Sequence, residues 1–152
     1  RKRKEEVYKM KYDAKNLKIN SMLIMILSVL SVIVFAAKFM TGENSFENVR
    51  EIYGWSGQSA FIAYIVVIVF SVLLYLLEFY IGFKGSRQAD GKCKGRSNII
   101  LAKIMLVMNS LAVIISICGL ATGKDDVQYL CQSLIYVSVY YAYIRSAKAI
   151  SQ

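Results

Sequence analysis

Two ionisable side chains lie inside otherwise apolar stretches and are the residues best placed to do chemistry. Glu78 interrupts the apolar run 60–83, and Lys103 interrupts the run 98–121, each five residues inside the end that faces the basic segment between the runs. A charge at membrane depth costs roughly 2.5 to 3.5 kcal/mol when it is unpaired. The placement therefore predicts an ion pair between the two helices, or snorkelling of Lys103. The functional alternative is a proton or ion relay through Glu78.

Two further polar residues extend this candidate cluster. Asn109 lies near the middle of its apolar run, where its amide needs a hydrogen-bond partner. Tyr140 lies in the last apolar run at the same depth as Glu78 and Lys103. We predict an intramembrane polar cluster of Glu78, Lys103, Asn109 and Tyr140, which acts either as structural hydrogen-bonding groups or as a polar pathway.

The elements that would position these residues are four apolar stretches in a chain of 152 residues that is 57% hydrophobic. They run over about 21–40, 60–83, 98–121 and 127–144, each close to the 20 or so residues that cross a bilayer. Backbone groups in lipid must be satisfied within their own segment, so such stretches are helices. We predict an all-α membrane protein, a four-transmembrane-helix bundle, with domain 21–152. The basic juxtamembrane segment 1–20 is expected to lie on the inner leaflet as a helix, or to fray.

Charge placement predicts the orientation. Segment 1–20 holds eight Lys or Arg against three acids, and loop 84–96 holds five against one. The other two loops are slightly acidic. By the positive-inside rule, both termini and the basic loop are cytoplasmic in a multi-pass protein of the cell membrane. The basic loop is also predicted to bind anionic lipid of the inner leaflet through Lys84, Arg87, Lys92, Lys94 and Arg96.

Each span also shows a candidate packing face at steps of three and four residues, where small and polar side chains let helices approach. In span one the face consists of Ser21, Ser28, Ser31, Phe35 and Lys38. In span two it consists of Tyr64, Ser71, Tyr75, Glu78 and Gly82. In span three the face consists of Asn98, Ala102, Met105, Asn109, Ala112, Ser116 and Gly119. In span four it consists of Tyr129, Gln132, Tyr136, Tyr140 and Tyr143.

A short amphipathic helix is predicted in the first outer loop. Asn44 and Glu47 have the spacing of an N-cap and an N3 residue, and Gly54 is placed as a stop. Tyr53 and Trp55 suit the boundary between membrane and water.

The composition argues against several kinds of chemistry. The chain has no histidine, so the usual catalytic base and the commonest transition-metal ligand are missing. Its three cysteines form no C-x-x-C motif. Cys118 and Cys131 flank the third loop and are expected to be small buried residues, with a disulfide as the alternative. We predict no catalytic residue, no metal site and no cofactor, and therefore not an enzyme.

The end of span two carries the motif Tyr80-Ile81-Gly82-Phe83-Lys84-Gly85, in which a Gly-apolar-basic-small turn leads into a basic loop. With the four-span plan and both termini inside, it resembles the small tetraspan membrane proteins of bacteria. The resemblance implies the topology and no activity.

Two functions remain open. The first is a non-catalytic membrane protein that acts as an accessory subunit, scaffold or immunity-type factor. The alternative is a small channel or transporter that uses the intramembrane polar cluster. The predicted partners are membrane lipids and either a membrane-protein partner or a second copy of the chain, with no nucleic acid.

Overall fold

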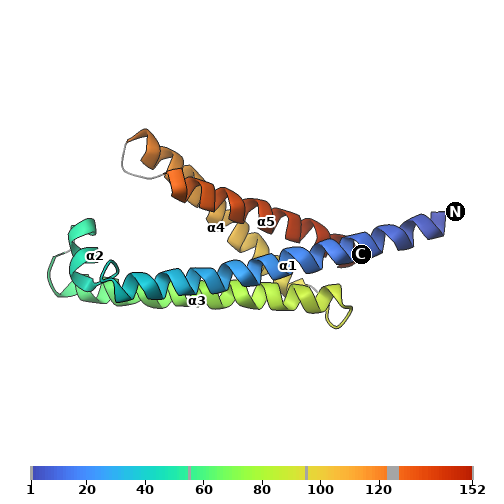
Figure 1. Cartoon of the computed structure of the whole chain (residues 1–152), viewed down its shortest axis with the longest axis horizontal. Helices are drawn as coiled ribbons and strands as arrows, with labels where there is room; N and C mark the ends of the chain where they lie inside the picture. The colour runs from blue at the N-terminus through green and yellow to red at the C-terminus, as the bar shows by residue number, and fades with distance from the viewer. Residues whose placement is uncertain (1, 55, 95, 123–126, 152) are drawn as a thin grey trace. The chain divides into compact units, whose positions relative to one another are not determined.

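The computed structural model describes residues 2–54, 56–94, 96–122 and 127–151, and these residues form helices and no strand. The helices are α1 (Lys2–Met40), α2 (Phe46–Tyr53), α3 (Gln58–Ala89), α4 (Arg96–Ala121) and α5 (Val127–Ser151) (Figure 1). The all-α prediction is confirmed. By length and composition, three segments within these helices are able to cross a membrane: Met10–Met40, Ser59–Ala89 and Arg96–Ala121. The chain is therefore compatible with a multi-pass membrane protein.

The chain divides into two compact units. The large unit contains Arg1–Met25 and Tyr80–Gln152, and the small unit contains Ile26–Phe79. Helices α1 and α3 contribute residues to both units, whereas α4 and α5 lie entirely in the large one.

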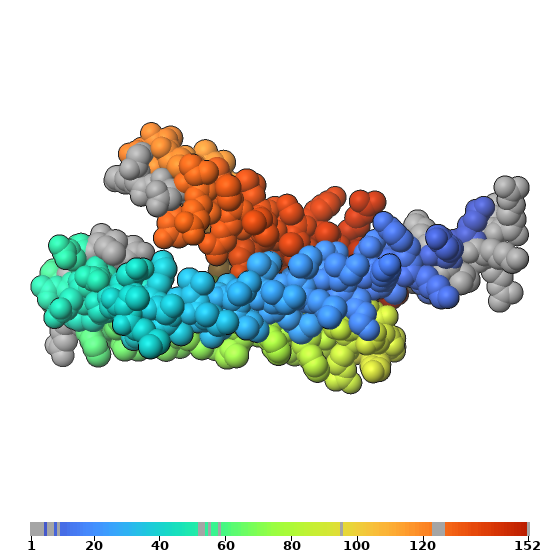
Figure 2. Space-filling model, viewed as in Figure 1, coloured from blue at the N-terminus to red at the C-terminus, as the bar shows by residue number. Residues whose placement is uncertain are grey.

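In the small unit, α1 packs on α3 through the faces predicted for spans one and two. The Ser28 hydroxyl donates a hydrogen bond to the Tyr75 carbonyl oxygen over 2.8 Å. The ring of Phe35 meets the ring of Tyr75 edge-on, with 5.8 Å between the ring centroids. The opposite side of α1 stays uncovered in the space-filling view (Figure 2), and Ile26, Leu30 and Ile33 on that side are about half exposed.

Helix α2 belongs to the small unit and is held by aromatic contacts. Its Phe46 meets Phe61 and Tyr64 of α3 edge-on, at centroid distances of 5.5 Å and 5.4 Å. Gly54 ends the helix with a φ of 63°, as predicted. The N-cap prediction is wrong by one position.

Ser45, and not Asn44, is the N-cap of α2. Ser45 has extended backbone angles, and its hydroxyl accepts a hydrogen bond from the Asn48 backbone N–H. The carbonyl oxygen of Asn44 instead accepts a hydrogen bond from the Tyr64 hydroxyl. Trp55, predicted as an interfacial anchor, and loop residues 124–126 lie outside the described residues.

In the large unit, α4 and α5 pack against each other. Helix α4 buries the inward face that the sequence predicts, with Asn98, Ala102, Met105 and Ser116 buried. On α5 only the C-terminal half of the predicted tyrosine face is buried, at Tyr136, Tyr140 and Tyr143. Tyr129 and Gln132, nearer the N-terminus of α5, are exposed.

The boundaries of the basic segments differ from the prediction. Helix α1 is continuous from Lys2 to Met40, so residues 2–20 belong to the same helix as the predicted first span. Helix α3 runs on to Ala89, which places Lys84 and Arg87 on the helix, and the turn comes only at Gly91, with a φ of 71°. Gly82 and Gly85 both lie inside α3 and do not end the helix. Helix α1 packs closely against both glycines.

The cysteines also differ from the expectation. All three are free thiols, so Cys118 and Cys131 are not bridged, and both are exposed instead of buried. Cys93 is half-buried and its thiol lies 3.4 Å from the Lys84 carbonyl oxygen.

Candidate functional site

The predicted intramembrane polar cluster is divided between the two units. Glu78 belongs to the small unit, whereas Lys103, Asn109 and Tyr140 belong to the large one. The ion pair between Glu78 and Lys103 therefore stays a prediction. Glu78 is only 6% exposed, and its Oε2 has no hydrogen-bond partner among the described residues.

The other three members of the predicted cluster have different surroundings. Lys103 is exposed. The Asn109 side chain donates a hydrogen bond to the Met105 carbonyl oxygen of its own helix over 2.8 Å. Tyr140 is fully buried, and its ring stacks on Tyr136 at a centroid distance of 6.5 Å. The Asn109 amide thus has a hydrogen-bond partner on α4 itself.

The five basic residues of the predicted lipid-facing loop surround the turn between α3 and α4. Lys92 and Lys94 lie in the turn, and Arg96 begins α4. On α3, the ammonium of Lys84 lies over the Tyr80 ring and the guanidinium of Arg87 over the Phe83 ring, at 5.7 Å and 5.8 Å from the ring centroids. Such cation–π contacts hold each charge over an aromatic ring of the same helix.

The best-organised polar site is a buried group that we call the polar clasp: Gln88 of α3, Asn98 of α4 and Tyr143 of α5. The Asn98 amide nitrogen donates to the Gln88 side-chain oxygen over 2.9 Å and to the Tyr143 hydroxyl over 2.6 Å. The Tyr143 hydroxyl in turn donates to the Ile81 carbonyl oxygen of α3 over 3.1 Å. Three helices are thereby joined at the basic end of the unit.

Gln88 extends the polar clasp to the last turn of α5. Its amide nitrogen donates to the Ala147 carbonyl oxygen over 3.0 Å and to the Ser151 hydroxyl over 2.9 Å. Gln88 is 3% exposed and Asn98 is fully buried, so these bonds form where water does not compete for them. The side chains of the polar clasp are engaged chiefly with each other and with backbone carbonyls.

Two glycines of α3 let the neighbouring helices come close enough to form the polar clasp. A Cβ placed on Gly85 would lie 2.5 Å from both the Ser21 hydroxyl oxygen and the Tyr143 hydroxyl oxygen. A Cβ on Gly82 would lie 2.7 Å from the Ser21 carbonyl oxygen. Only glycine at these two positions lets α1 and α5 approach α3 to this distance.

One ion pair links the start of the bundle to the turn after α3. The Lys18 ammonium lies 2.7 Å from the Asp90 carboxylate. This hydrogen bond from Lys18 holds the pKa of Asp90 below its ordinary value. Both side chains are partly exposed, so the contact orients the turn more than it stabilises the fold.

The sequence interpretation named Asn98 and Tyr143 only as members of packing faces, and it missed Gln88. The signal was present. Continuing the three-and-four spacing of span two beyond Glu78 and Gly82 leads to Gly85 and then Gln88. The basic residues after position 83 indicate a loop when charge alone is considered, and they hide this continuation of the helix.

The fold and the site define an all-helical protein with apolar helices of membrane-spanning length, joined at one end by buried hydrogen bonds. Among the described residues, no group of three or more Asp, Glu or Cys side chains is arranged to hold a metal ion. The chain matches no protein-family model, no curated protein and no solved structure.

Proposed function

We propose that this protein is a non-catalytic, multi-pass protein of the cell membrane that acts as an accessory subunit, scaffold or immunity-type factor. It binds its partners through helix faces and lipid contacts. The observation that carries this proposal is the small buried share of its apolar segments: only 11% of the most apolar window of each of the three long helices is buried. Most residues of these windows thus keep apolar surface that lipid or partner helices can cover.

The polar clasp supports the same proposal. Catalysis needs polar groups aimed at a reacting molecule, whereas the hydrogen bonds of the clasp join side chains and carbonyls of the protein itself. A site of this kind fixes helices in one arrangement.

The proposed topology has four spans, with α5 as the fourth and both termini in the cytoplasm, as the basic ends of α1, α3 and α5 suggest. Single-cysteine labelling tests it. In a background without native cysteines, a cysteine introduced at Ser45 or Thr122 is expected to react with a membrane-impermeant maleimide added to intact cells. Restored Cys93 is expected to react only after permeabilisation. Labelling of Cys93 in intact cells contradicts the topology.

The function itself is tested by purification of the tagged full-length chain from native membranes in mild detergent, followed by mass spectrometry. We expect a stoichiometric membrane-protein partner or a defined homo-oligomer. The matched test is a substitution on the uncovered face of α1, Ile33→Asn, compared with Ile33→Val. Loss of the partner only in the Asn variant supports recognition through that face, and a chain that is monomeric and alone under all conditions contradicts the proposal.

A small channel or transporter is the second candidate function. The buried carboxylate of Glu78, with one oxygen unpartnered among the described residues, is the observation that favours it. Purified protein in liposomes would then conduct ions or protons, and Glu78→Gln would abolish the flux while leaving thermal unfolding unchanged. Unchanged flux in that variant rejects this second function.

A further inference from the structure

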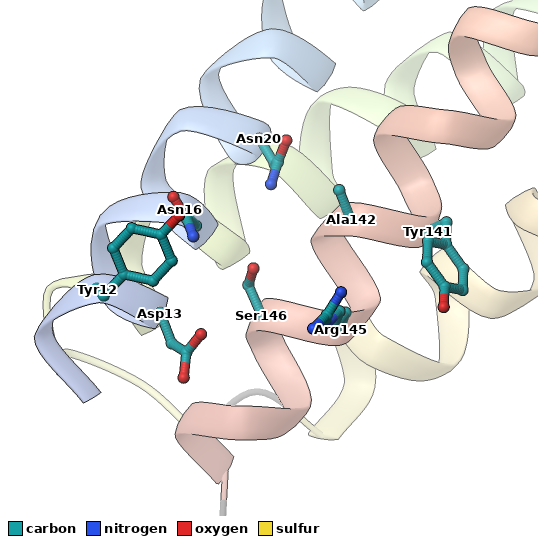
Figure 3. Close-up of a pocket in the computed structure, with 8 residues that line it drawn as sticks. All are labelled: Tyr12, Asp13, Asn16, Asn20, Tyr141, Ala142, Arg145 and Ser146. Carbon is teal, nitrogen blue, oxygen red and sulfur yellow. The ribbon is translucent and has the colours of Figure 1, made fainter. Parts of the chain in front are cut away.

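A second polar site lies apart from the polar clasp, between α1 and α5 within the large unit. It is a cavity of about 360 Å³. Helix α1 contributes Asp13, Asn16 and Asn20, and helix α5 contributes Arg145 and Ser146 (Figure 3). The cavity is therefore bordered by one acid, one base and several neutral hydrogen-bonding groups.

Helix periodicity explains why these residues meet. Asp13, Asn16 and Asn20 follow one another at steps of three and four, so they occupy one face of α1. Ser146 is 7% exposed and Arg145 next to it is exposed, so α5 presents a buried hydroxyl beside an accessible guanidinium. Asn20 and Ser146 point into the space between the helices (Figure 3).

The opposite charges of the cavity do not neutralise each other. In the described part of the chain, neither Asp13 nor Arg145 takes part in an ion pair. The side chains of Asn16 and Asn20, both half-buried, also form no hydrogen bond with any described residue. These side chains therefore keep hydrogen-bonding capacity that water or a ligand in the cavity can use. A molecule that carries both a positive and a negative group would satisfy this set.

The position of the cavity along the helices indicates where such a molecule comes from. Asn20 directly precedes the apolar run of α1, and Arg145 directly follows the apolar run of α5. The cavity thus lies at the level where apolar sequence gives way to basic sequence, which is the head-group layer in a bilayer. Leu23, 41% exposed, continues the α1 face of Asn16 and Asn20 and offers an apolar path for an acyl chain.

We propose that this cavity binds a zwitterionic head group with a primary ammonium and a phosphate, the chemistry of phosphatidylethanolamine. The Arg145 guanidinium donates hydrogen bonds to the phosphate oxygens. The Asp13 carboxylate and the amide oxygens of Asn16 and Asn20 accept the N–H groups of the ammonium. The volume is at the small end of ligand pockets, which suits a head group whose chains remain in the bilayer.

This site differs in chemistry from the basic turn between α3 and α4. The basic turn attracts any anionic lipid by charge alone, whereas the cavity requires an N–H donor and a phosphate together. The inference requires that the chain lies in a membrane, and it holds whether or not a protein partner exists.

The test is native mass spectrometry of the delipidated full-length chain in detergent. Phosphatidylethanolamine, phosphatidylcholine and phosphatidylglycerol with identical acyl chains are added in turn. Phosphatidylcholine has no N–H to donate, and phosphatidylglycerol has no cation. We expect phosphatidylethanolamine to be retained roughly fivefold better than either, the ratio that about 1 kcal/mol gives for a partly exposed charged contact. Equal retention of all three lipids, or the highest retention for phosphatidylglycerol, overturns the proposal.

Two variants with matched controls locate the site. Asp13→Asn is expected to remove the preference for phosphatidylethanolamine over phosphatidylglycerol, while Glu51→Gln, the same charge change on exposed α2, leaves it intact. Arg145→Gln is expected to lower retention of phosphatidylethanolamine, while Lys148→Gln on the same helix does not. Circular dichroism confirms that each variant folds. A wild-type preference in Asp13→Asn, or an equal loss in the control variants, overturns the assignment.

A soluble head group identifies the source of the ligand. If glycerophosphoethanolamine displaces the bound lipid, the site recognises head-group chemistry alone and also accepts it from solution. If it does not displace the lipid while the preference for phosphatidylethanolamine persists, the site recognises the intact lipid. Displacement by inorganic phosphate at the same concentration overturns the zwitterionic assignment. A purification in which the chain is monomeric and alone would reject the proposed scaffold function and leave these lipid results unaffected.

Discussion

The hydroxyl of Tyr143 is the hub of the polar clasp, and its removal tests how the large unit is held together. Tyr143→Phe deletes two hydrogen bonds, the one accepted from Asn98 and the one donated to the Ile81 carbonyl oxygen. It leaves the ring volume unchanged, so no cavity term is added. Each such bond contributes about 0.5 to 1.5 kcal/mol, and interhelical bonds in membranes average about 0.6 kcal/mol. We expect a loss of about 1 to 3 kcal/mol in the free energy of unfolding.

The assay is unfolding in mixed detergent micelles, followed by circular dichroism as the denaturing detergent is increased. Tyr141→Phe is the matched control, because it makes the same chemical change two positions away on a side chain that is 62% exposed. This control is expected to change the free energy of unfolding by less than about 0.5 kcal/mol.

A double-mutant cycle separates the clasp from a general effect on α5. Asn98→Ala removes the donor to Tyr143, so the double variant should lose less stability than the sum of the two single variants, by about 0.5 kcal/mol or more. The polar clasp is refuted as the link between α4 and α5 if Tyr143→Phe behaves like Tyr141→Phe, or if the two single losses simply add.

Three further outcomes are expected. Gly85→Ala should prevent the close approach of α1 and α5 to α3 and lower the free energy of unfolding by about 1 to 3 kcal/mol, measured in the same unfolding assay; a neutral Ala variant contradicts this packing. The hydrogen bond from Lys18 lowers the pKa of Asp90, so the stabilisation by this ion pair should be complete above a pH of about 4 and be lost as the pH falls through the lowered pKa. The difference in unfolding free energy between the wild-type chain and Asp90→Asn should therefore vanish in acid. A difference that grows in acid contradicts this coupling. If Glu78 and Lys103 pair as predicted, removing either should cost more stability than removing both, and additive losses in a double-mutant cycle show that they do not meet.

Much of the helical architecture follows from the sequence because bilayer thickness and helix geometry leave few choices. A run such as 98–121 has the length to cross a membrane, and the structure has α4 over Arg96–Ala121. The three-and-four spacing on that run also identifies the buried face of α4, because a helix repeats its faces every 3.6 residues. Lys2–Met40 and the end of α3 are harder to predict, since basic residues on an uninterrupted helix look like a loop when charge alone is considered.

The candidate sites depend on relations that periodicity does not contain. Gln88 and Asn98 are close in sequence and come together across the turn at Gly91, and Tyr143 joins them only because α5 returns to the same end. Asp13 and Arg145 lie at nearly opposite ends of the chain, and nothing local to either residue indicates that they border one cavity.

Composition and the helical repeat are enough to predict that the chain is helical, that its helices are long and apolar, and where its small and polar packing faces lie. Which polar groups meet depends on the rotation and approach of the packed helices. They engage the Asn109 amide with its own helix and join Gln88, Asn98 and Tyr143 in the polar clasp. They also place Asp13 and Arg145 around one cavity with no ion pair to any described residue. The physical reason is that hydrogen bonds and ion pairs form only when the two atoms lie within about 3 to 4 Å. The rotation and spacing of the packed helices therefore determine which polar groups bond, and glycines such as Gly85 allow the short spacing.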